Sequence, residues 1–177
     1  HFPAYVAEVC AAFSLFGREV TPEALGAATI SLVGLANVFG TLAASRLGVR
    51  YPKPYVLSAI YALRAVVILL FLWTPVSPAT VVIFSVAMGV LWLSTVPLTS
   101  ALVAAMFGTG AMATLYGFVF LSHQIGSFIG VWMGGRLYDL TGGYDLVWAV
   151  AVGLGAFSAL AHLPIRERPW AAPAGPA

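Results

Sequence analysis

The feature that most constrains this chain is a long stretch without a charged side chain. No Asp, Glu, Lys or Arg occurs from Ala65 to Gly135, and only short turn signals interrupt the run. A soluble core does not need such a run, whereas several helices crossing a hydrocarbon layer of about 30 Å do. Because 61% of the 177 residues are hydrophobic and 8% are charged, we expect an all-α, polytopic membrane protein.

Charge and motifs exclude other classes. The formal net charge of +2 comes from few, scattered basic residues, so no nucleic-acid partner is expected. The single cysteine, Cys10, cannot build a disulfide framework or a thiolate metal site and is read as an apolar filler. No zinc-protease, nucleophile-elbow or Walker motif occurs. We therefore expect no enzyme, no cofactor and no metal.

Turn signals divide the chain into spans. The loop Gly17–Glu23 is polar, and Thr21 is a plausible N-cap before Pro22. Five full spans are expected, and the third contains Pro97: Ala24–Ser45, Pro54–Trp73, Thr80–Val103, Met112–Gly135 and Tyr144–Pro164. In the first span, one face should pack inward because small and polar residues recur at helical spacing: Gly34, Asn37, Thr41 and Ser45.

The two ends of the chain receive separate predictions. Residues 1–16 are read as the outer end of a cut-off span, because the chain starts without Met or a signal peptide. We expect an N-terminal part to be missing. Residues 170–177 form a Pro/Ala tail that is expected to be disordered.

Basic residues predict the orientation. Five lie in the loop after the first span and at the C-terminal end: Arg46, Arg50, Lys53, Arg166 and Arg168. The opposite side holds Arg18 and Arg136 among acidic residues. The positive-inside rule therefore places the C-terminus in the cytoplasm of a multi-pass cytoplasmic-membrane protein.

Arg64 is the most informative residue, because it lies near the middle of a span, about 15 Å from either end. A central arginine costs about 2.5–3.5 kcal/mol on insertion scales. A carboxylate, backbone carbonyls or an anionic ligand must offset that cost. Two readings stay open: Arg64 binds a ligand, or it pairs with an acidic residue of the missing part.

The span Met112–Gly135 carries the second ionisable group, His123, at a similar depth. Gly126, Gly130 and Gly134 recur every four residues on the same side, which predicts close helix packing. His123 is either a proton-accepting or substrate-contacting group, or a neutral hydrogen-bonding residue. Gln124 has the same two readings. The remaining polar candidates either line a cavity or form hydrogen bonds between helices: Asn37, Thr95 and Thr99. Pro97 frees a backbone carbonyl that hydroxyls or neighbouring helices can satisfy.

Several stretches together resemble the C-terminal half of a major facilitator superfamily transporter. They are HFPAY, AIYALRAVVILLF, GVLWLSTVPLTS and MATLYGFVFLSHQIGSFIGVWMGGRLYDLTGGYD. They are most similar to the monocarboxylate-transporter-like and oxalate/formate-antiporter-like branch. The resemblance implies that residues 1–16 end helix seven and residues 17–169 form helices eight to twelve. It also implies alternating access between this six-helix half and a missing N-terminal half.

In that branch, basic residues in helices eight and eleven hold a substrate carboxylate. Here helix eight offers Asn37, helix eleven offers His123, and Arg64 in helix nine is the only central guanidinium. The resulting hypothesis is a secondary transporter of a small organic anion, a monocarboxylate, coupled to protons through His123. The alternatives are an efflux pump for amphipathic compounds and a membrane scaffold that transports nothing. The expected partners are the lipid bilayer, the missing half and a small-molecule substrate.

Overall fold

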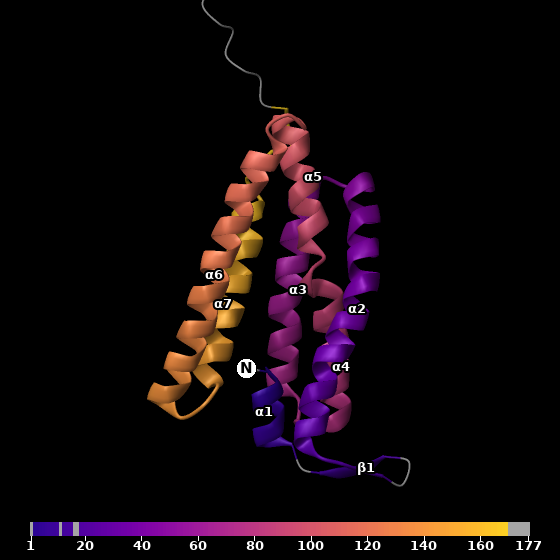
Figure 1. The fold of residues 1–177 in the computed structure, drawn as a ribbon, viewed down its shortest axis with the longest axis vertical. Helices are drawn as coiled ribbons and strands as arrows, with labels where there is room; N and C mark the ends of the chain where they lie inside the picture. Colours follow the sequence, from indigo (N-terminus) through magenta and orange to yellow (C-terminus); the bar gives the residue numbers. More distant parts are fainter. Residues whose placement is uncertain (1, 11, 16–17, 170–177) are drawn as a thin grey trace, which may run out of the picture.

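The computed structural model describes residues 2–10, 12–15 and 18–169, and the predicted tail 170–177 lies outside them. It is a bundle of roughly parallel helices with one small hairpin at one end (Figure 1). In chain order the elements are α1 (Phe2–Val9), β1 (Phe13–Leu15), β2 (Arg18–Val20), α2 (Pro22–Arg50), α3 (Lys53–Trp73), α4 (Pro78–Trp92), α5 (Thr95–Phe107), α6 (Met112–Thr141) and α7 (Asp145–His162). Five segments are long and apolar enough to cross a membrane, with α4 and α5 counted together. The prediction of an all-α, polytopic membrane protein is confirmed.

Capping residues begin two of the helices, α2 at the residue that the sequence predicts and α4 two residues before the predicted Thr80. The Thr21 side chain accepts a hydrogen bond from the Ala24 backbone N–H at 3.3 Å, and Pro22 follows as the first helical residue. At α4, Ser77 and Thr80 satisfy each other's backbone N–H groups in a capping box. The α6 helix ends at Gly142, whose φ of 69° is left-handed and favours glycine.

The prediction of an irregular loop at Gly17–Glu23 is wrong in part. The strands β1 and β2 pair antiparallel, with Phe13 opposite Val20. Both residues pack against the apolar cluster at this end of the bundle, which includes Val6 and Leu25. Burial of these two side chains explains why a segment with a polar centre forms a hairpin. The α1 helix ends at Val9.

The third predicted span is not one helix, because it breaks between Trp92 and Thr95. Pro97 has no N–H to donate to the carbonyl of Leu93, and its ring collides with that carbonyl in a regular helix. The Val96 N–H instead reaches the Leu93 carbonyl at 3.0 Å. The break therefore lies one turn before the proline and frees backbone groups in the middle of the bundle.

The tightest helix crossing joins α2 to α4. A Cβ on Gly40 would lie 1.8 Å from the Val90 carbonyl oxygen, and one on Gly89 would lie 2.7 Å from the Val33 oxygen. The buried face of α2 follows Ala36, Gly40, Ala44 and Gly48, with Asn37 beside it. The predicted inward face is correct only for Asn37, because Gly34 and Ser45 are exposed and Thr41 is half-buried.

Helices α6 and α7 stand beside the other spans on one side of the bundle (Figure 1). The α7 helix packs along α3, whereas α6 contacts α5 and α7. In α6 the described part of the chain buries only Gly134. The loops alternate between the two ends of the bundle, so the α2–α3 and α5–α6 connections lie at the same end as the segment after α7 (Figure 1). That arrangement agrees with the predicted topology.

Candidate functional site

Arg64 reaches from the middle of α3 to the broken end of α4. Its Nε donates to the Leu91 carbonyl oxygen at 3.1 Å, and its Nη2 donates to the carbonyl oxygens of Leu91 and Trp92. These carbonyls end a helix, where the helix dipole is negative. Of the three means of offsetting a central guanidinium that the sequence leaves open, the structure uses backbone carbonyls.

Asn37 holds the other side of the same break. Its Oδ1 accepts a hydrogen bond from the Leu93 backbone N–H at 2.8 Å, and its side chain is buried. Leu93 follows the last residue of α4, so its N–H would otherwise lose a partner where the helix unwinds. The break is thus fixed from two helices, by an acceptor on α2 and a cation on α3.

An aromatic contact connects the guanidinium to the end of α7. The Arg64 Cζ lies 5.1 Å from the centroid of the Tyr61 ring, which is within cation–π range. Tyr61 in turn stacks on His162 with ring centroids 5.1 Å apart. The His162 Nδ1 lies 2.7 Å from the Ser158 carbonyl oxygen in its own helix. Arg64 therefore has a stacked aromatic side chain as well as carbonyl partners.

Two hydroxyl groups beyond the break donate hydrogen bonds to backbone carbonyls of their own helix, α5. Thr99 donates to the Thr95 carbonyl oxygen at 2.8 Å, and Ser100 donates to the Pro97 carbonyl oxygen at 3.1 Å. Both threonines are half-buried. They lie in the first turns of α5, directly after the break that Arg64 and Asn37 hold.

His123 and Gln124 lie elsewhere, on the exposed surface of α6. In the part of the chain that the structure describes, the His123 ring contacts Phe120 of its own helix, with centroids 6.3 Å apart. All the hydrogen bonds of Arg64 go to α4 and its terminus. The structure therefore brings together Arg64 and Asn37 among the predicted site residues, and leaves His123 and Gln124 on a separate face.

The glycine stripe of α6 has space beside it. Among the described residues, no atom beyond the helix's own backbone lies within 4 Å of a Cβ built on Gly126 or Gly130. Gly130 and Gly134 border a small cavity against α7. Close packing of another helix on this stripe remains a prediction.

An apolar cavity of about 530 Å³ extends from the α6–α7 loop to the broken end of α4. Five helices contribute to its wall, and no charged residue lines it: Phe2, Pro3, Thr29, Ile30, Val33, Phe84, Met88, Trp92, Gly130, Val131, Tyr144, Val147, Trp148 and Ala151. The Trp148 Nε1 is buried and has no hydrogen-bond partner among the described residues. A ligand with an apolar body would fit this lining.

Sequence reasoning missed three of these features. The break could have been placed from Pro97 by counting back four residues to the carbonyl that its ring displaces. The closeness of Gly40 to Val90 and the lone indole of Trp148 have no signal in one sequence, because both depend on a neighbouring helix.

Comparison with known proteins agrees with this architecture. The sequence model of the Major Facilitator Superfamily matches residues 4–176. Over 80 residues the chain is 32% identical to a protein of Bacillus subtilis (strain 168) named as an uncharacterized MFS-type transporter, YcxA. That match covers 45% of this chain and 20% of the relative, so the chain spans about a fifth of the relative's length. No solved structure matches the chain.

Proposed function

Because this chain belongs to the major facilitator superfamily, we propose that it is the C-terminal half of a secondary transporter that moves a small organic anion. We assign the substrate to the monocarboxylates and the branch to the monocarboxylate-transporter-like and oxalate/formate-antiporter-like carriers, with proton coupling. In this proposal a second six-helix half closes the bundle, and the two halves rock about a site in the middle of the membrane. The C-terminus faces the cytoplasm, because the basic loop residues gather at that end.

The observation that carries the proposal is the guanidinium of Arg64 at a broken helix. Secondary transporters build substrate sites where membrane helices are discontinuous. The carbonyls of Leu91 and Trp92 orient the guanidinium through Nε and Nη2. Within the described residues, Nη1 makes no hydrogen bond. A carboxylate could therefore accept from Nη1 and complete the neutralisation of a charge that carbonyl dipoles only partly offset.

The remaining predicted residues take roles around this group. Asn37 positions the break through Leu93, and Thr95 and Thr99 lie on the adjoining turns of α5. His123 and Gln124 occupy the exposed face of α6, where the N-terminal half would complete a cavity. His123 would carry or tune the transported proton there. Pro97 and the glycines of α6 would permit the bending and close packing that alternating access requires.

The test uses the full-length protein in vesicles, with internal pH recorded after addition of a panel of small carboxylates. Acidification above passive permeation is expected for the true substrate and is lost in Arg64→Gln. Arg64→Lys is the matched control, since an ammonium keeps the charge and can still donate to a carbonyl, so it should retain part of the uptake. Normal uptake by a folded Arg64→Gln protein would remove Arg64 from the site.

Proton coupling is tested by His123→Ala. The rate of uptake should lose its dependence on pH, because the variant lacks the imidazole that is proposed to carry the proton. An unchanged pH profile would leave His123 as a hydrogen-bonding residue between helices.

The apolar cavity favours a second candidate function, efflux of amphipathic compounds. Among the described residues no charged side chain lines it. The same vesicles would then extrude an amphipathic fluorescent dye and show no response to any carboxylate. Dye extrusion that is reduced by Trp148→Phe and unaffected by Arg64→Gln would favour this function over anion transport.

A further inference from the structure

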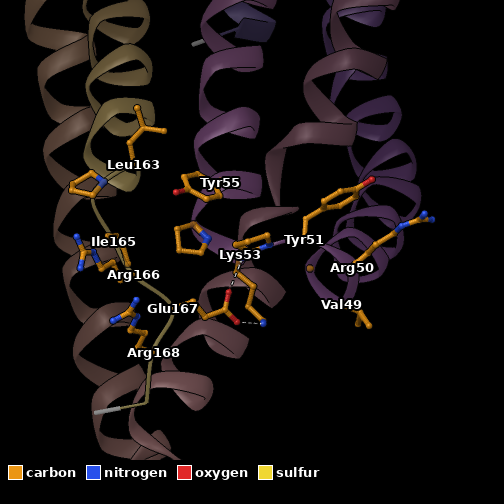
Figure 2. Close-up of a pocket in the computed structure, with 14 residues that line it drawn as sticks. Val49, Arg50, Tyr51, Lys53, Tyr55, Leu163, Ile165, Arg166, Glu167 and Arg168 are labelled. Atoms are coloured by element: carbon orange, nitrogen blue, oxygen red, sulfur yellow. Dashed lines mark hydrogen bonds and ion pairs between the residues drawn. The ribbon is translucent and has the colours of Figure 1, made fainter. Parts of the chain in front are cut away.

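The end of the bundle opposite the hairpin carries a basic hollow of about 830 Å³. It lies between the α2–α3 connection and the segment that follows α7 (Figure 2). Four basic residues line it with one acid: Arg50, Lys53, Arg166, Arg168 and Glu167. Glu167 is already engaged, because it accepts from the Lys53 backbone N–H at 2.9 Å and forms an ion pair with the Lys53 Nζ. Among the described residues no acid pairs with the three arginines.

The segment Leu163–Pro169, here called the strap, sets the direction of two of these arginines. Ile165 packs against the apolar cluster of Ala44, Leu57 and Leu98. Glu167, two residues on, turns to Lys53. The Arg168 backbone N–H donates to the Arg166 carbonyl oxygen at 2.9 Å, so the strap turns at Glu167, and Arg166 and Arg168 are exposed. Figure 2 shows both guanidinium groups on the same side of the strap, away from Lys53.

The hollow also lies where membrane-spanning helices end, which is the depth expected for lipid headgroups. The α2 helix ends at Arg50, α3 begins at Lys53 and α7 ends at His162, so three membrane-spanning helices end around it. Tyr51 and Tyr55 are exposed on its rim, and tyrosine is enriched at the membrane–water interface. Basic pockets between membrane helices at this depth bind anionic headgroups.

We propose that Arg166 and Arg168 bind the phosphate groups of anionic phospholipids, and that Ile165 and Glu167 hold the strap in the position that presents them. Arg50 extends the positive surface on the other side of the hollow (Figure 2). The site requires no substrate and is independent of the transport function. Glu167 is a positioning residue, because its carboxylate contacts Lys53 and not the lipid.

The experiment titrates full-length protein in neutral detergent with dioctanoyl phosphatidylglycerol and measures its dissociation constant. Loss of each arginine is expected to weaken binding about fivefold, so Arg166→Gln/Arg168→Gln should bind about 25-fold more weakly. Arg136→Gln is the matched control, since it removes one exposed arginine at the opposite end and should bind as the wild type does. Equal affinity of the double variant and the wild type would overturn the proposal.

Two further arms separate this site from simpler explanations. Glu167→Ala makes the hollow more positive, yet it should weaken lipid binding because the strap loses its anchor; tighter binding would show a diffuse positive surface and refute the positioning role. Inorganic phosphate at millimolar concentration should leave the lipid affinity unchanged. Competition by phosphate at the affinity of the lipid would reassign the site to a soluble anion. Melting temperatures in detergent establish that each variant is folded, and Arg168→Gln alone replaces the double variant if that variant is not.

Discussion

The crossing of α2 and α4 allows the sharpest prediction about stability, which concerns Gly40→Ala. A methyl group there would lie 1.8 Å from the Val90 carbonyl oxygen and 2.6 Å from its carbonyl carbon. Ordinary contacts begin at 3.4 Å, so the helices must separate by more than 1 Å. Neither obstacle is a flexible side chain, so the backbone itself has to move.

The cost follows from two consequences of that separation. Overpacking costs about 1–3 kcal/mol. Asn37 lies one turn from Gly40, so the separation also breaks the 2.8 Å bond that its Oδ1 accepts from the Leu93 N–H, which is partly buried. A donor left without a partner there costs about 1–3 kcal/mol. Alanine returns about 1 kcal/mol of helix propensity. The net loss in free energy of unfolding is therefore about 1–5 kcal/mol.

The assay is thermal unfolding in detergent, followed by tryptophan fluorescence. At about 2–4 °C per kcal/mol for a domain of this size, a loss of about 3 kcal/mol lowers Tm by about 10 °C. Gly153→Ala is the matched control, because nothing lies within 4 Å of its Cβ in α7, and its Tm should hold or rise slightly. A Gly40→Ala protein with the Tm of the wild type would refute the close approach of α2 to α4.

Two other predictions concern single hydrogen bonds, and a third concerns pH. Ser58→Ala removes the buried 2.7 Å bond to the Ala159 carbonyl between α3 and α7 and should cost about 1 kcal/mol, whereas Ser45→Ala, which loses only a bond within α2, should be neutral in the same melt. Thr21→Ala removes the N-cap of α2 and should cost about 0.5–2 kcal/mol, while Thr21→Ser should retain stability; equal losses would exclude capping as the cause. Burial raises the pKa of Glu167, but the hydrogen bonds from Lys53 and its charge outweigh burial and hold that pKa below its ordinary value of 4.5. The stabilisation from this pair is therefore complete well above that ordinary value of 4.5, which the unfolded chain keeps, and is lost as pH falls through the lower folded pKa. The Tm difference between wild type and Glu167→Gln should accordingly be constant from about pH 5.5 to pH 8 and shrink towards pH 3; a difference that persists at pH 3 would show that the ion pair is not its source.

Local sequence patterns predict much of the fold. Hydropathy located the five spans, because the bilayer requires a minimum length of apolar helix whatever packs beside it. Thr21 and Pro22 marked the start of α2, because a cap acts within one turn. The basic residues predict that the segments bearing Arg50 and Arg168 lie at one end of the bundle. In the structure these segments meet there, where Lys53 forms an ion pair with Glu167.

Predictions that depended on a neighbouring helix were less complete. The prediction places the inward face of α2 along Gly34, whereas the structure buries the face along Gly40. Small residues occur on both faces, and only contact with α4 distinguishes the two. The hairpin at Phe13–Val20 forms because its ends find an apolar cluster built from distant segments. Both outcomes follow from which surfaces are buried, and burial is a property of the assembled bundle.

For Arg64, one property follows from local sequence and another depends on a neighbouring helix. From the sequence one can predict that a guanidinium lies near the middle of a span and must be compensated, because the cost of a charge in hydrocarbon does not depend on the fold. Pro97 likewise predicts that a neighbouring span releases a carbonyl. Which carbonyls meet Arg64 depends on the packing of the helices: those of Leu91 and Trp92 accept from the arginine, while Asn37 accepts from the N–H of Leu93. The close approach of Gly40 to Val90 sets the register of α4 along α2, and a shift of one turn would give Arg64 different partners.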